Sequence, residues 1–330
     1  MKKYYIRLLY KRQYTADKAR KDCDAILERH GYTGIGVGIM RSYTIFGSFL
    51  KFLSVCTLIY RIPKNEVLFI QIPAYNKLSK LIYRISFFRT KHIQVLIHDL
   101  QSIRTGSKSA FKDEQYILQR AEVIIAHTPK MKDLLISRGV DESKIKVLMM
   151  FDYVVNNRNQ LQRNYANSIT FAGNFRKSLF LRDLDQCKDA NFILYGVYHV
   201  NIPKYDNVQY AGKFDSDDIR KIDGDWGLVW DGDSCETCNG LFGEYLKYIA
   251  SHKLSLYIAA DMPVVVWSES ALSNYVQENS LGIVVDKIED IPVKIGKLSN
   301  LEKEKIKDAV GSFSLILRNG NMLGGILKTL

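Results

Sequence analysis

Short apolar runs alternate with amphipathic segments along the first half of the chain. The runs have the length of buried strands, and the segments between them carry apolar residues at helical spacing. Such alternation predicts a parallel sheet covered by helices on both faces. The expected strands are residues 4–9, 35–40, 67–70, 93–97, 123–126 and 144–148, and the expected helices are residues 16–30, 45–60, 77–88, 112–120 and 130–137.

A polar, asparagine-rich stretch at residues 153–167 interrupts the alternation, and a second series follows it. We expect an α/β protein of two doubly wound, Rossmann-like domains whose sheets face a cleft with their carboxyl ends. The expected parts are an N-terminal domain at 1–152, a linker at 153–167, a second domain at 168–312, and a segment at 313–330 that packs back toward the N-terminal domain.

The second series has the same character as the first but ends in a glycine-rich segment. Glycine weakens helices, so a broken helix is expected at residues 313–327. The other expected elements are strands at 169–172, 192–195, 208–210, 226–230, 264–266 and 283–285, and helices at 182–185, 216–222, 251–260, 270–278 and 302–309.

The formal net charge of +12 favours an anionic partner. Nucleotides, lipid head groups and nucleic acids all meet that description. Nucleic acid is the least favoured, because no basic stripe interleaved with aromatic residues appears. We expect a cytoplasmic protein, for which a peripheral contact with the inner face of the membrane stays open.

Two further features bear on the class of protein. The five cysteines are scattered, and Cys235-x-x-Cys238 lacks a second pair, so reduced thiols fit better than a disulfide framework or a zinc site. The apolar stretch 43–62 contains Lys51 at its centre. A lysine at mid-bilayer is costly. A buried helix of the α/β domain is therefore favoured, and a face on the membrane or on another subunit is the second choice.

The segment 251–260 reads as a helix that feeds a buried strand. Ser251 is a suitable N-cap, Asp261 suits a left-handed stop, and Pro263 prevents continuation. Lys253 stands in the first turn, where a cation opposes the helix dipole. An anion bound between Lys253 and the free N–H groups of the helix start would explain this placement. The alternative is that Lys253 extends into solvent.

Further candidates follow other strands of the second domain. Gly173 permits close backbone approach after the strand 169–172, and Asn174, Arg176 and Lys177 come next, which suits a diphosphate. An ordinary turn would also explain them. Tyr210 could stack on a base, although core packing is the commoner role of such a ring.

In the first half, the strand 93–97 ends in His98 and Asp99. Either side chain could take the proton of a hydroxyl group, and a structural hydrogen-bonded pair is the alternative. Thr15 is a helix cap that could also touch a ligand. The dinucleotide, P-loop, nucleophile-elbow, His-x-x-x-His and EF-hand patterns do not occur, so nothing in the sequence supports metal dependence.

At these residues the chain resembles a family of bacterial GT-B glycosyltransferases. The family includes β-1,6-galactofuranosyltransferases of polysaccharide assembly and glucosyltransferases that extend glycans on streptococcal adhesins. The family usually has glycine where Asp261 stands. The segments that carry the resemblance are SHKLSLYIAADMPVVV, TFAGNFRKS, VLIHDL, AEVIIAHTPKMKDLLISRGV, GLVWDGD and SFSLILRNG.

The resemblance implies a metal-independent enzyme that moves a sugar from a UDP-sugar to a glycan acceptor with inversion. Galactofuranose is the first choice of sugar and glucose the second, the acceptor is lipid-linked or otherwise anchored, and a homo-oligomer is allowed. His98 or Asp99 is the expected base, and no cofactor or metal is expected. The donor contacts that it implies are Thr15, Gly173, Asn174, Arg176 or Lys177, Tyr210, and Ala250, Ser251, His252, Lys253, Leu254 and Ser255.

Two other classes of function stay open at this point. A sugar-nucleotide epimerase of the same architecture would turn over without an acceptor. A non-catalytic partner subunit would keep the fold without the chemistry. The presence of Lys253 and of the His98–Asp99 pair argues against such a subunit.

Overall fold

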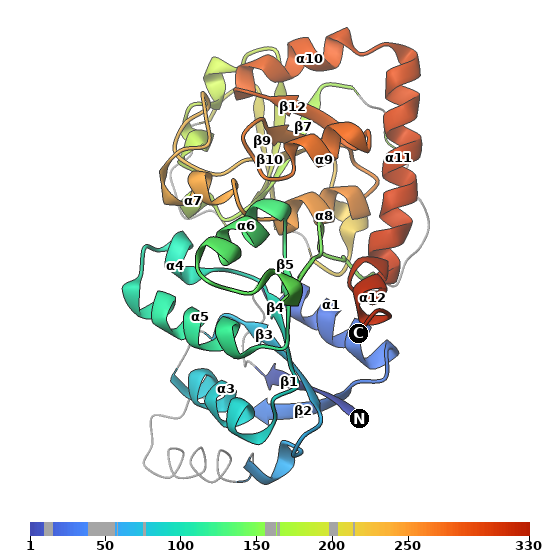
Figure 1. Cartoon of the computed structure of the whole chain (residues 1–330). Coiled ribbons are helices and arrows are strands. Elements are labelled where there is room, and N and C mark those ends of the chain that lie inside the picture. Colours follow the sequence, from blue (N-terminus) through green and yellow to red (C-terminus); the bar gives the residue numbers. More distant parts are fainter. Residues whose placement is uncertain are drawn as a thin grey trace. The chain divides into compact units, whose positions relative to one another are not determined.

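The computed structural model describes two compact units, Met1–Leu148 with Leu323–Leu330, and Met149–Met322 (Figure 1). Both units are built on a parallel sheet of six strands, which confirms the predicted α/β class. The described residues are 1–9, 16–38, 57, 59–74, 77–155, 163, 166–197, 204–213 and 215–330.

The first unit holds the strand order β2-β1-β3-β4-β5-β6. The two central strands β3 and β4 are buried along their whole length, as their apolar sequences predict. The strands are β1 (Lys3–Leu9), β2 (Thr33–Gly38), β3 (Val67–Ile72), β4 (Ile93–Ile97), β5 (Val123–Ala126) and β6 (Ile145–Val147). The helices are α1 (Ala16–Arg29), α3 (Lys77–Arg89), α4 (Gln101–Arg104), α5 (Lys108–Arg120) and α6 (Pro129–Ser137).

The second unit holds the strand order β12-β11-β10-β7-β8-β9. Its strands are β7 (Ser168–Gly173), β8 (Asn191–Gly196), β9 (Val208–Gly212), β10 (Trp226–Val229), β11 (Val264–Trp267) and β12 (Gly282–Val285). Its helices are α7 (Gly240–Tyr245), α8 (His252–Ala259), α9 (Ser273–Glu278), α10 (Ile291–Lys297) and α11 (Asn300–Asn319), and α12 (Asn321–Leu327) ends the chain.

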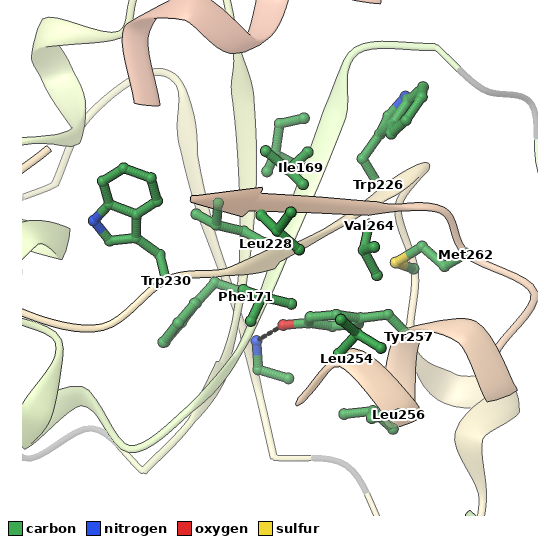
Figure 2. Close-up of a cluster of buried hydrophobic side chains, with 14 of the residues drawn as sticks. Ile169, Phe171, Trp226, Leu228, Trp230, Leu254, Leu256, Tyr257, Met262 and Val264 are labelled. Carbon is green, nitrogen blue, oxygen red and sulfur yellow. Dashed lines mark hydrogen bonds between the residues drawn. The ribbon is translucent and has the colours of Figure 1, made fainter. Parts of the chain in front are cut away.

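Helix α8 is fixed to this sheet by a buried tyrosine (Figure 2). The ring of Tyr257 lies against Gly227 of β10, where an added Cβ would come within 2.1 Å of the tyrosine Cγ. Its hydroxyl accepts the backbone N–H of Ala172 in β7 at 2.7 Å. Burial raises the pKa of this hydroxyl, which therefore stays protonated. One side chain thus connects α8 to both central strands.

The C-terminus of α8 is held by two arginines distant in sequence. Arg318 of α11 donates from Nε to Ala259 O at 2.7 Å and from its guanidinium to Asp261 Oδ2 at 2.6 Å. Arg163 donates to Ala260 O at 3.0 Å. Cations suit the C-terminal carbonyl groups of a helix. Asp261 adopts a φ of 55°, the left-handed stop that the sequence predicts.

The glycine-rich segment 313–327 is a broken helix, as predicted. The break lies at Gly320, which has a φ of 79° and separates α11 from α12. Helix α11 is longer than the expected 302–309, because burial of Val310, Ser314 and Leu317 outweighs the weak propensity of the glycine inside it. Two helix predictions are wrong: the segments 182–185 and 216–222 form only short 3₁₀ turns.

The apolar stretch 43–62 lies largely outside the described residues. No helix in the part of the chain that the structure describes is both long and apolar enough to cross a membrane.

Candidate functional site

Lys253 points to the carboxyl end of β10 from the first turn of α8. Its Nζ donates to Trp230 O at 2.7 Å and to Asp231 Oδ1 at 2.9 Å. The side chain is 16% exposed, so the alternative of a lysine extended into solvent is wrong. Of the three N–H donors of the ammonium group, two have acceptors among the described residues.

The loop after β7 meets this lysine. Lys253 Nζ lies 4.7 Å from the centroid of the Phe171 ring. A Cβ on Gly173 would lie 2.9 Å from Phe171 Cζ and 3.5 Å from Lys253 Cε. A side chain at Gly173 would therefore clash with the Phe171 ring and contact the Lys253 side chain. The sequence offers Asp231, at the end of the strand 226–230, as a possible hydrogen-bond acceptor for a sugar, but not as the partner of Lys253. Phe171 was not among the predicted site residues.

The polar residues after Gly173 separate into two roles. Asn174 Oδ1 accepts the backbone N–H of Arg176 at 3.0 Å, so its side chain shapes the turn. The Arg176 side chain is exposed. Lys177 Nζ lies 5.0 Å from the centroid of the Phe242 ring. The structure therefore holds Lys177 more closely than Arg176.

Tyr210 joins this loop from β9. Its hydroxyl donates to Gly196 O at 2.9 Å, and its ring packs edge-on against Phe175 at 6.1 Å between centroids. The side chain is 45% exposed. An added Cβ on Gly196 would lie 2.4 Å from Gly173 O, which shows how closely the two strand ends pack.

The six residues from Ala250 to Ser255 differ in what they offer. Ala250, Leu254 and Ser255 are buried. Ser251 occupies the N-cap position without a side-chain cap bond. The His252 ring packs against Tyr153 at 5.1 Å between centroids. Lys253 is thus the one charged side chain of this segment.

The first unit places His98 and Asp99 after β4. His98 lies 2.7 Å from Gln71 Oε1 through its Nε2, and its backbone N–H donates to Ile72 O at 2.8 Å. Asp99 forms an ion pair with Arg104 of α4. A carboxylate paired with a guanidinium is a poor proton acceptor, so this geometry favours His98 as the base.

Thr15, which is predicted as a helix cap and a possible ligand contact, lies outside the described residues. Helix α6, which is expected at residues 130–137, begins at Pro129, and its N-cap Thr128 accepts the Met131 N–H at 3.1 Å. Within the described residues, no group of three or more His, Cys, Asp or Glu side chains is placed to hold a metal ion. Lys253 and its partners belong to the second unit, and His98 belongs to the first.

Two family models match the chain in tandem. They describe the N-terminal domain of glucosyltransferase 3-like proteins, over residues 3–150, and the C-terminal domain, over residues 169–330. The chain belongs to the glucosyltransferase 3-like family. It is a glycosyltransferase of the GT-B fold, as the resemblance implies.

Relatives of the enzyme in sequence are named either as a galactofuranosyltransferase or as glucosyltransferases. Beta-1,6-galactofuranosyltransferase WbbI of Escherichia coli (strain K12) is 28% identical over 97% of this chain and 96% of its own. Glucosyltransferase 3 of Streptococcus parasanguinis is 26% identical over 78% of this chain and 76% of its own.

Solved structures agree with the enzyme in fold. Anabaena Alr3699/HepE in complex with UDP and glucose gives a TM-score of 0.64 at 12% identity, over 100% of both chains. The lipopolysaccharide outer core galactosyltransferase WaaB, in its apo form, gives a TM-score of 0.55 at 12% identity, also over 100% of both chains.

Proposed function

We propose that the enzyme transfers a sugar from a UDP-sugar to a glycan acceptor, without a metal and with inversion. The observation that supports this most is the placement of Lys253 at the start of α8. A positive side chain beside free helix N–H groups suits the charge that develops on a diphosphate leaving group. The third N–H of Lys253 is then available to a phosphate oxygen.

Galactofuranose is the proposed sugar. The galactofuranosyltransferase WbbI matches almost the whole chain, whereas the match to glucosyltransferase 3 of Streptococcus parasanguinis covers 78% of it. Glucose is accordingly the second choice. Gly173, Lys177 and Tyr210 would complete the donor site beside Lys253. Gly173 ends β7, Lys177 lies in the turn that follows it, and the Tyr210 ring packs against Phe175 of the same turn.

The acceptor would bind in the first unit. A cavity of about 220 Å³ lies there, beside the end of β3, and is lined by groups of both charges and by two aromatic rings. Rings and hydroxyl-binding charged groups are suited to a sugar. His98 would take the proton from the attacking hydroxyl. The lining includes Pro73, Lys80, Tyr83, Asp113, Glu114 and Tyr116.

Incubation with UDP-galactofuranose or UDP-glucose and a panel of glycan acceptors, with and without EDTA, tests the proposal. We expect faster transfer from UDP-galactofuranose, no effect of EDTA, and a product of inverted anomeric configuration by NMR. Conversion of the donor into another UDP-sugar without an acceptor would indicate an epimerase instead. Absence of nucleotide binding under every condition would indicate a non-catalytic subunit.

A further inference from the structure

A buried glutamine connects His98 to a carboxylate on the first helix. Gln71 is 4% exposed and is the polar residue of an otherwise apolar central strand, β3. Its Oε1 lies 2.7 Å from His98 Nε2, and its Nε2 donates to Asp24 Oδ1 of α1 at 2.7 Å. We propose that Asp24 is a positioning residue for His98: acting through the Gln71 amide, it decides which ring nitrogen carries the proton. This inference rests on the proposed role of His98.

The hydrogen-bonding capacities of the three groups fix this direction. An ionised Asp24 can only accept, so the NH₂ group of Gln71 must face it. The oxygen of Gln71 then faces His98 and can only accept, so His98 Nε2 must carry a proton. In the neutral imidazole the lone pair is therefore on Nδ1, which becomes the nitrogen that can take a proton from a hydroxyl group.

Protonation of Asp24 removes this constraint. A neutral carboxyl group can donate as well as accept, so the Gln71 amide is able to turn its NH₂ group toward His98 Nε2. In that orientation Nε2 must accept, so the ring proton moves to Nδ1, which then no longer acts as a base. The proton on Asp24 comes from solvent and the ring proton exchanges with solvent, so the step needs no other reactant.

The surroundings of Asp24 set the pH at which this happens. Burial raises the pKa of Asp24 to about 7. The positive charges of Arg7 on β1 and Arg20 on α1 lower this pKa, and the negative charge of Glu28 on α1 raises it slightly. Arg7 Nε lies 3.4 Å from Asp24 Oδ2, and Tyr5 on β1 also faces the carboxylate. Asp24 therefore takes up its proton near neutral pH, above the range of an ordinary carboxyl group.

NMR of the unliganded protein tests the inference without any substrate. The chain has six histidines, so the ¹⁵N–¹H ring correlations can be resolved, and the His98 signals are assigned by their loss in His98→Gln. In the wild type we expect His98 to carry its proton on Nε2 above about pH 7.5 and on Nδ1 in part between about pH 7 and 6.

Two variants are expected to change the position of the His98 ring proton in different ways. Asp24→Asn offers Gln71 both a donor and an acceptor, so we expect a mixture of His98 tautomers with no change near pH 7. Gln71→Glu keeps the shape and, when ionised, faces His98 with an acceptor only, so we expect Nε2–H at neutral and higher pH and a raised His98 pKa. Gln94→Met is the matched control, because Gln94 is a buried glutamine on β4 that bonds Tyr32 instead.

The outcomes distinguish this inference from the proposed function. A His98 tautomer that is the same in the wild type and in Asp24→Asn at every pH would overturn the inference, and so would a Gln71→Glu spectrum like the wild type. If the tautomers behave as expected but the wild type transfers no sugar, the proposed function fails and the inference about the ring stands. If transfer occurs, the acidic limb of its pH profile should lose the component near pH 7 in Asp24→Asn.

Discussion

Replacement of the buried Arg318 is expected to lower the stability of the second unit strongly. Its side chain is 1% exposed, and its partner Asp261 is 4% exposed. Replacing Arg318 with methionine leaves a buried carboxylate without its cation and removes a donor from Ala259 O. Breaking a buried ion pair in this way costs about 3–5 kcal/mol. For a unit of this size, that corresponds to a fall in Tm of roughly 6–20 °C.

Tryptophan fluorescence during urea unfolding measures this loss directly. The three tryptophans of the chain, Trp226, Trp230 and Trp267, are all buried in the core of the second unit, so their signal reports on that unit. A loss below about 1 kcal/mol for Arg318→Met would refute the reasoning, because such a value is typical of an exposed pair.

Variants of Asp261 separate the charge from the backbone conformation. Both Asp261→Ala and Asp261→Gly remove the carboxylate, but only glycine relieves the left-handed φ of 55°. We expect the glycine variant to be more stable than the alanine variant by about 1–2 kcal/mol. Combined with Arg318→Met, Asp261→Gly should recover part of the loss, and strictly additive effects would contradict a coupled pair.

Three further predictions concern other parts of the fold. Tyr257→Phe leaves the buried N–H of Ala172 without its acceptor and should cost about 1–3 kcal/mol in the same urea titration; an unchanged midpoint would contradict this. Gly173→Ala places a Cβ 2.9 Å from Phe171 Cζ, so we expect at least about a tenfold weaker affinity for UDP by calorimetry. Burial lowers the pKa of His127 to about 4. Below about pH 6.5 the unfolded chain therefore binds a proton that the folded chain does not, so acidification from about pH 6.5 to 4 should remove up to about 3 kcal/mol of stability from the first unit. Calorimetric scans should show a smaller acid loss in His127→Gln, and an equal loss would refute this assignment.

The strands were predictable from the sequence because buried parallel strands are continuous apolar runs. All the expected strand segments overlap strands of the structure. A short-range prediction was also confirmed, the left-handed Asp261 after α8. Such a stop depends on neighbours in the sequence.

The partners of the candidate site residues could not be predicted in the same way. Asp231 pairs with Lys253 across 22 positions, and Gln71 bonds His98 across 27. A polar residue inside an apolar strand, such as Gln71, is a signal that could have been used, because a buried amide needs partners. Which partners it finds depends on the order of strands in the sheet, which the local pattern does not contain.

Lys253 and Asp231 allow a test with two opposite outcomes. Asp231→Asn keeps the lysine but releases it from its carboxylate, so we expect tighter binding of UDP. Lys253→Ala should weaken binding by about 10- to 100-fold, because a charged hydrogen bond contributes about 1.5–3 kcal/mol. Lys247→Ala is the matched control, since Lys247 pairs with Glu244 and Glu269 instead.

Isothermal titration of UDP in the presence of EDTA, with the wild type and Lys253→Ala, tests the central claim most directly. The proposed donor site predicts binding by the wild type without metal and a loss of affinity of at least about tenfold in the variant. Equal affinities of the two proteins, or binding that requires a divalent cation, would contradict the role assigned to Lys253.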